Sequence, residues 1–216
     1  NVFEKGAEIK STDFIRKKWL DNSFYGFVSN LNGQLNDLDL NFGLVVNQYY
    51  GRHFCNVSGV KFTEIQNYEY YRNNSLKNEI SGFAKAIWKH NRWELFGDLQ
   101  LRNIFYHTNV VQQGDDEGVD LSRNWNFFNP KAGVNYLIPS GKIYFSYAHA
   151  QREPNRDDLF ANPDTKEEKL HDFEAGVEKS FGKVQFSANA YYMNFVNQLV
   201  LTGEINNIGA FVRANS

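Results

Sequence analysis

Hydrophobic and polar residues alternate along much of this chain, most clearly between Lys166 and Val196. Such two-residue alternation is typical of a β-strand with one apolar and one polar face. Gly182, within the turn Phe181-Gly182-Lys183, can supply the positive φ that a tight hairpin needs. We therefore predict two antiparallel strands here. Their mostly apolar faces carry His171, Phe173, Ala175 and Val177 in the first strand, and Val184, Phe186, Ala188, Ala190 and Tyr192 in the second.

The same pattern predicts further strands, grouped into hairpins. Asn32-Gly33 is a strong turn signal between the first pair. Residues 1–23 carry no clear pattern, and we expect an extended or loop state there. Another strand is expected to begin near Gly209. The other predicted strands are 23–31, 38–50, 76–88, 93–101, 129–138 and 142–150, with short connections at 32–37, 89–92 and 139–141.

Long connections alternate with the short ones. In an up-and-down barrel, every second connection lies at the same end, so one rim would carry tight turns and the other long loops. Outer-membrane barrels have this asymmetry. The predicted fold class is therefore all-β, an antiparallel up-and-down transmembrane β-barrel segment. The expected long connections are 51–75, 110–128, 151–168 and 197–207.

Aromatic residues make up 16% of the chain although its mean hydropathy is −0.56. Alternating faces cancel in a hydropathy average, as they do in membrane β-barrels. Trp88 and Trp93 flank a short turn, where one aromatic girdle is expected. The opposite girdle is expected at Tyr49, Tyr50, Tyr106 and Tyr147, because such rings suit the boundary between lipid and water. The core of a soluble β-sandwich is the alternative explanation for these rings.

Composition and motifs exclude several classes of function. The net charge of −2 gives no reason to expect a nucleic-acid partner. Cys55 is the single cysteine, so no internal disulfide is expected and the thiol is interpreted as unreactive. No apolar run is long enough for a transmembrane helix. No nucleophile elbow, phosphate loop or metal-spaced His/Cys cluster occurs, so we expect neither an enzyme nor a cofactor.

Charged residues fall on the face opposite the apolar one. We expect them to line an aqueous lumen, since a Lys or Arg facing mid-membrane lipid costs about 2–4 kcal/mol. The residues assigned to the lumen are Glu79, Lys85, Glu94, Asp98, Arg102, Asp172, Glu174 and Glu178.

The later part of the chain resembles the barrel of TonB-dependent outer-membrane receptors. The resemblance rests on KEEKLHDFEAGVEKSFGKVQFSANAYYMNFVNQLVLTGEINNIGAFVRAN, on the preceding AGVNYLIPSGKIYFSYAHAQREPNRDDLF, and on the segment 96–102. It covers about 129–216 and extends upstream to about 76. It implies a barrel of about 22 strands filled by an N-terminal plug domain, with uptake of a scarce nutrient driven through TonB.

The chain departs from that family pattern in three ways. First, it shows neither a plug domain nor a TonB box. Second, it has only about eight or nine strands. Third, it ends in Ala-Asn-Ser rather than an aromatic residue. We therefore expect residues 1–216 to be one partial barrel domain without the plug, lying in the bacterial outer membrane. The expected partners are the lipid bilayer, TonB acting through the missing plug, and a small-molecule or metal-chelate ligand.

The charged connection 151–168 is the candidate ligand-binding loop. Arg152, Arg156, Asp157 and Asp158 are its candidate binding residues, and a solvated loop is the alternative. No histidine occurs between 151 and 170, which argues against haem, since haem-uptake receptors typically carry one in this loop. Three adjacent carboxylates at 115–117 lack the ligand spacing of a Ca²⁺ site.

The sequence therefore predicts an active-transport receptor for a scarce nutrient such as a siderophore or cobalamin. A self-contained small barrel with a structural or adhesive role is one alternative, and it requires the first and last strands to pair. A barrel enzyme is the other, and it requires a hydrogen-bonded Ser–His or Asp–His pair.

Overall fold

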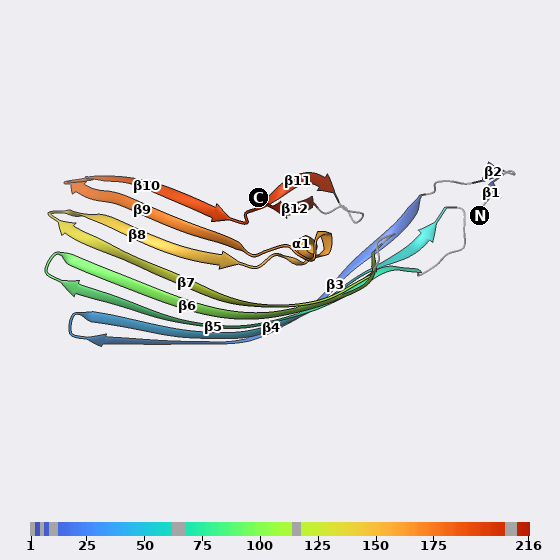
Figure 1. Ribbon diagram of the computed structural model, residues 1–216, viewed down its shortest axis with the longest axis horizontal. Coiled ribbons are helices and arrows are strands. Elements are labelled where there is room, and N and C mark those ends of the chain that lie inside the picture. Colours follow the sequence, from blue (N-terminus) through green and yellow to red (C-terminus); the bar gives the residue numbers. More distant parts are fainter. Residues whose placement is uncertain (1–2, 5–6, 9–12, 62–67, 114–117, 206–210) are drawn as a thin grey trace.

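The computed structural model describes residues 3–4, 7–8, 13–61, 68–113, 118–205 and 211–216. Its main feature is one eight-stranded antiparallel sheet in which every strand pairs with its neighbour in sequence, from β3 to β10 (Figure 1). This arrangement confirms the predicted up-and-down topology. The strands are β3 (Phe14–Leu35), β4 (Leu38–Val60), β5 (Tyr68–His90), β6 (Trp93–Gln113), β7 (Val119–Ile138), β8 (Gly141–Arg152), β9 (Glu168–Phe181) and β10 (Val184–Val196).

Smaller elements lie beside this sheet. Strand β1 (Phe3–Glu4) pairs with β2 (Ala7–Glu8), and β11 (Leu199–Ile205) pairs with β12 (Phe211–Asn215). A six-residue helix, α1 (Arg156–Ala161), interrupts the connection between β8 and β9. Among the described residues, no helix has the length and apolar composition needed to cross a bilayer.

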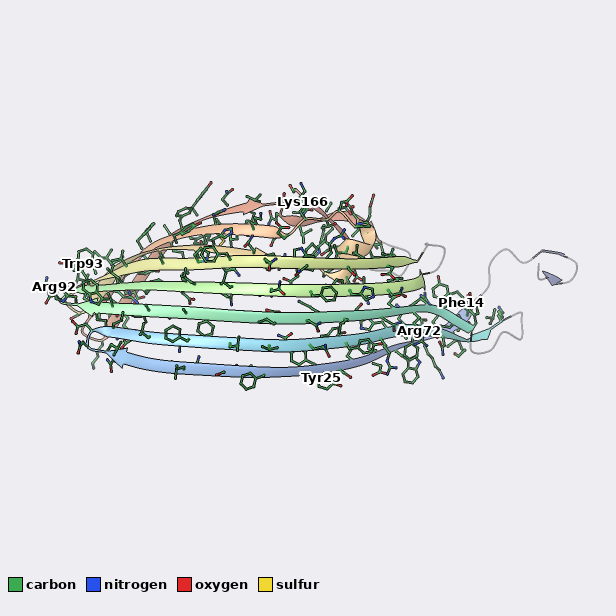
Figure 2. All side chains as sticks on the ribbon, turned by 60° about the horizontal axis from the view of Figure 1, so that its bottom comes forward. Phe14, Tyr25, Arg72, Arg92, Trp93 and Lys166 are labelled. Atoms are coloured by element: carbon green, nitrogen blue, oxygen red, sulfur yellow. The ribbon has the colours of Figure 1, made fainter. Side chains whose placement is uncertain are left out.

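Two-residue turns join the strands at one end of the sheet, which we call the short-turn end. Arg92 and Trp93 mark this end in Figure 2, with Phe14 and Arg72 at the opposite, long-loop end. The turns lie at 36–37, 91–92, 139–140 and 182–183, and each contains one residue with positive φ: 51° at Asn36, 54° at Asn91, 55° at Ser140 and 60° at Gly182.

All four turns lie within the predicted short connections, but the turn signal in the first of them was placed on the wrong residues. Asn32 and Gly33 do not turn, because they pair with Asn41 and Leu40 inside the β3–β4 ladder. The chain reverses four residues later at Asn36, since asparagine tolerates the left-handed conformation better than most residues.

The strands are much longer than the sequence predicted. Strands β3 to β7 have 20 to 23 residues, whereas a tilted strand crosses a bilayer with about 9–11. The expected loops at 51–75 and 110–128 are therefore largely strand. Likewise, β11 occupies much of the expected connection 197–207. The carboxylates at 115–117 and Gly209 lie outside the described residues, and the last strand begins at Phe211.

The strand register confirms that the predicted lumen residues share one face. Lys85 lies opposite Asp98, which lies opposite Lys131, and the row continues through Ala148 to Asp172. Because side chains alternate between faces, every second residue along these strands belongs to the same side. We call this side the lumen face and the opposite side the outer face.

The outer face is apolar and uncovered near the short-turn end. Phe42, Leu44 and Val46 are 38–44% exposed, with no second layer of the described chain above them. An exposed apolar band on a sheet with a polar opposite side is expected where the wall meets lipid. The band contains Leu40, Phe42, Leu44, Val46, Ala84, Ala86, Leu95, Leu99, Leu101, Ala132, Val134, Ile143, Phe145, Phe173, Val177, Val184 and Phe186.

The aromatic girdles are partly as predicted. Trp88 and Trp93 lie on the outer face next to a short turn, and they are 42% and 49% exposed. Tyr50 and Tyr147 also lie on the outer face. The assignment of Tyr49 and Tyr106 to a girdle was wrong, because the register places both on the lumen face, where Tyr106 is buried.

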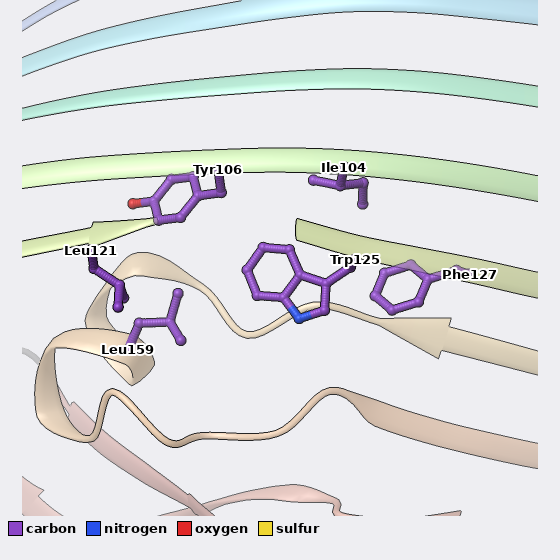
Figure 3. Close-up of a cluster of buried hydrophobic side chains, with 6 residues drawn as sticks. All are labelled: Ile104, Tyr106, Leu121, Trp125, Phe127 and Leu159. Atoms are coloured by element: carbon purple, nitrogen blue, oxygen red, sulfur yellow. The ribbon is translucent and has the colours of Figure 1, made fainter. Parts of the chain in front are cut away.

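Toward the long-loop end, the hydrophobic positions change sides. Beyond Asn103 of β6, the buried hydrophobic side chains are Ile104, Tyr106 and Val110 on the lumen face, while His107 and Asn109 face outward. Strand β7 mirrors this change. The result is a compact hydrophobic cluster on the lumen face (Figure 3), made of Ile104, Tyr106, Leu121, Trp125, Phe127 and Leu159.

Candidate functional site

Helix α1 folds back over the lumen face near the long-loop end. Its fully buried residue, Leu159, inserts among Tyr106, Leu121 and Trp125 (Figure 3). The helix begins in a capping box: the Asn155 side chain accepts from the Asp158 amide, and the Asp158 carboxylate accepts from the Asn155 amide, each at 2.9 Å. A short helix of this kind is stable because its apolar side has a wall to pack on.

A buried ion pair fixes α1 from its other side. Arg213 of β12 donates to both carboxylate oxygens of Asp158, at 2.8 and 2.6 Å, and Asp158 is only 2% exposed. A bidentate guanidinium–carboxylate pair is specific in geometry. Asp158 therefore uses its oxygens to hold the α1 loop together with the β11–β12 hairpin.

The segment before α1 is anchored to the wall by a second ion pair. Glu153 accepts from Lys77 of β5 at 2.5 Å and lies 3.7 Å from Arg102 of β6. Burial of Glu153 opposes its ionisation, but the hydrogen bond from Lys77 and the two positive charges outweigh it. The pKa of Glu153 is consequently lowered from its ordinary value.

A cavity of about 430 Å³ lies between this segment and the lumen wall. It combines aromatic rings, hydroxyls, three cations and two carboxylates, which suits a small polar ligand with planar or apolar parts. The wall contributes Tyr49, His53, Ser75, Lys77, Tyr106 and Trp125, and the α1 segment contributes Arg152, Glu153, Pro154, Asn155, Arg156 and Asp157.

One contact at the edge of this cavity links β4 directly to α1. Arg156 Nη1 lies 2.6 Å from His53 Nδ1, although 103 residues separate them in sequence. Arg156 also donates to Asp157 Oδ1, at 2.8 and 3.0 Å. His53 Nε2 lies 3.2 Å from Asn22 Oδ1 on β3, which also accepts from Tyr49 at 2.9 Å.

The structure brings three of the four predicted binding residues together at the cavity. Arg152, Arg156 and Asp157 line it, whereas Asp158 is buried behind it in the pair with Arg213. Arg152 is also paired with Glu168 at 2.9 Å. The six wall residues were not predicted as part of the site. The alternation of β4 to β7 carries a signal for them, since each lies on the lumen face.

A histidine–serine pair of the kind the enzyme alternative requires does occur, but its geometry does not suit hydrolysis. His107 Nδ1 lies 3.0 Å from Ser122 Oγ and 3.7 Å from Asp120 Oδ1. One ring nitrogen cannot both take a proton from serine and be held by aspartate. The pair also lies on the outer face, away from the cavity. Within the described ranges, no three His, Cys, Asp or Glu side chains gather as a metal site.

Comparison with known proteins gives a family match over nearly the whole chain. Residues 5–215 match the family described as "TonB dependent receptor-like, beta-barrel". No curated protein matches the chain in sequence.

Solved structures share the fold at low sequence identity. The copper transporter OprC matches 93% of this chain with a TM-score of 0.74 and 15% identity. The ferric-catecholate import receptor Fiu from E. coli K12 matches 91% at 0.62 and 15%, and the ferric citrate transporter FecA matches 87% at 0.65 and 13%. The chain spans 33%, 34% and 30% of these three structures, respectively, or about a third of their length.

Proposed function

This chain belongs to the TonB-dependent receptor family, as part of its β-barrel, and we propose that the complete protein is an outer-membrane receptor that imports a scarce nutrient. In this proposal, the apolar outer face contacts the lipid of the bacterial outer membrane. TonB supplies the energy through a plug domain enclosed by the barrel. The nutrient is a small molecule or metal chelate, such as a siderophore or cobalamin.

The cavity beneath α1 is the observation that carries this proposal. It lies on the lumen face, beyond the apolar band and toward the long-loop end, where a ligand arriving from outside the cell would first meet the barrel. The family and its structural neighbours, among them a copper transporter, a ferric-catecholate receptor and a ferric citrate transporter, are transporters and receptors and not enzymes. They support transport as the activity.

The open shape of the sheet supports this reading over a self-contained small barrel. In the described part of the chain, β3 and β10 are the two edges of the sheet and do not pair with each other. A row of unpaired backbone groups is not tolerated in lipid. We propose that both edges pair with other strands of the complete barrel.

Uptake in the native host tests the function. A strain that lacks the gene should fail to grow on one limiting nutrient from a panel of ferric chelates, copper and cobalamin, and the gene should restore growth. A strain without TonB should show the same failure. Growth restored equally well without TonB would contradict the proposal.

Arg152 tests the site, because it lines the cavity and its side chain is 57% exposed. Arg152→Gln should weaken binding of an anionic chelate by roughly fivefold, the scale of one partly exposed charged contact. Arg52→Gln is the matched control: Arg52 is 47% exposed and paired with Asp21 on the outer face, so affinity should not change. Calorimetry on the full-length receptor measures the affinity of each variant. Equal affinities of the two variants would contradict the assignment of the cavity as the binding site.

A further inference from the structure

We propose that His53 and Arg156 form an acid-sensitive latch that closes the edge of the cavity and opens when the external medium is acidified. This regulation rests on the proposed function, in which the cavity receives a ligand from outside the cell. The latch joins α1 to β4. The other anchors described above join this segment to β5, β6, β7 and β12 instead.

The geometry of the contact fixes the protonation state of His53. A guanidinium carries only donors, so His53 Nδ1, 2.6 Å from Arg156 Nη1, must be a bare acceptor. On the other side of the ring, His53 Nε2 lies 3.2 Å from the Asn22 carbonyl oxygen, which also accepts from Tyr49. Nε2 therefore carries the proton, and the ring is neutral. A second proton, on Nδ1, would point at the guanidinium and abolish the contact.

The charges around His53 make the contact sensitive to this one proton. On α1, Arg156 repels an imidazolium, while Asp157 attracts it but is already bound to Arg156 by two hydrogen bonds. The strands that pack against His53 offer Asn22, Tyr49 and Asn73, all uncharged at neutral pH. The other charged groups that line the same cavity are Lys77, Arg152 and Glu153, and Lys77 and Glu153 neutralise each other.

Burial and the nearby Arg156 guanidinium lower the pKa of His53, so the ring gains its second proton below the ordinary pH range of histidine. The pKa of Glu153 is lowered from its ordinary value. The stabilisation from the Glu153–Lys77 pair is therefore fully present above the ordinary pKa of a glutamate, and it is lost only when the pH falls through the lowered pKa of Glu153. Acid that protonates His53 therefore breaks the His53–Arg156 contact, while the Glu153–Lys77 pair holds. The first turn of α1 then loosens and separates from β4, while Glu153 stays bound to Lys77.

Hydrogen exchange of the ligand-free, full-length receptor in detergent tests the latch. The amides of Asp158 and Leu159 bond to Asn155 in the first turn of α1. After correction for intrinsic rates, peptides covering 154–162 should exchange about tenfold faster at pH 5.0 than at pH 7.5, the size expected for loss of a hydrogen bond to a charged group. The lower pH is set below the ordinary histidine range because burial and Arg156 lower the pKa of His53. His53→Asn keeps an acceptor at the δ position but cannot be protonated, so its exchange should not depend on pH.

Three further variants make the test independent of any single one. His53→Lys should exchange fast at both pH values, and Arg156→Gln should lose the pH response. His107→Asn, which changes a histidine on the outer face, should respond like the wild type. A pH-independent wild type, or an unaltered response in His53→Asn and Arg156→Gln, would overturn the latch. Because no ligand is present, this result is separate from the outcome of the uptake experiment.

Discussion

At the scale of single residues, glycines on the lumen face leave space for aromatic rings from a neighbouring strand. Gly43 lies opposite Phe83, Gly133 opposite Phe96, and Gly176 opposite Tyr144. A Cβ atom on Gly43 would approach the Phe83 ring to 2.0 Å. Glycine weakens a strand by itself, but here its missing side chain lets the ring lie flat across the backbone. The cross-strand pair offsets that weakness.

Gly133→Ala tests this arrangement. The new methyl group would lie 2.5 Å from the Phe96 ring and 2.8 Å from the Phe145 carbonyl oxygen, so the ring must leave its position. We expect a loss of about 1–3 kcal/mol in the free energy of unfolding, typical of overpacking. Gly97→Ala, where nothing lies within 4 Å of the added carbon, is the matched control and should be neutral. Urea unfolding in lipid vesicles measures both, and equal stabilities would contradict the account.

At the scale of elements, alternation predicted the sheet correctly only where the outer face is apolar and the lumen face polar. Beyond Phe105 of β6, the outer positions are the polar His107 and Asn109 and the lumen face is covered by α1, so the buried hydrophobic positions lie on the opposite face. If hydrophobic residues are expected on the outer face throughout, the segment Val119 to Phe127 shows no strand pattern. If they are expected on the lumen face, the buried Leu121, Trp125 and Phe127 fit a regular strand.

Helix α1 was missed for a different reason, although a local signal existed. Asn155 followed three residues later by Asp158 is a capping box in sequence, but six helical residues are too few for a periodic pattern. The candidate site was likewise predictable only where the signal is local in sequence. The cluster of charges in one connection indicated Arg152, Arg156 and Asp157. Wall residues such as Lys77 could not be placed, because their partners are distant in sequence and depend on the register of four strands.

The pair between Arg213 and Asp158 gives a prediction for this element. Arg213→Ala leaves a carboxylate that is 2% exposed without its cation, a change that typically costs about 3–5 kcal/mol. The cost should fall on the α1 loop and the β11–β12 hairpin, since the long ladders of β3 to β7 do not involve Arg213. Limited proteolysis should cut residues 155–165 faster while the thermal stability of the barrel is unchanged. Lys142→Ala, which removes an exposed pair with Glu178, should leave the loop intact.

At the scale of the whole molecule, the strands fall into two zones. Near the short-turn end, an apolar band is exposed on the outer face, and on β6 it runs from Leu95 to Leu101. It is bounded toward the long-loop end by amides that bond to each other, Gln48 to Asn78 at 2.9 Å and Asn103 to Asn126 at 2.7 Å. Beyond them, the wall carries the cavity and the hydrophobic cluster. The fold thus separates the zone proposed to lie in lipid from the zone proposed to bind the ligand.

Two adjacent positions on β6 test this placement in the bilayer. Leu99 lies on the outer face and is 52% exposed, while Gln100 lies on the lumen face opposite Asn129. Leu99→Arg places a charge against hydrocarbon and should cost about 2–4 kcal/mol, seen as a smaller fraction of folded, heat-modifiable protein in vesicles. Gln100→Arg adds the same side chain to the aqueous lumen and should lose at most the 3.0 Å hydrogen bond from Asn129. If the two variants insert equally well, lipid does not cover the outer face at this level, and the assignment of the apolar band to the membrane fails.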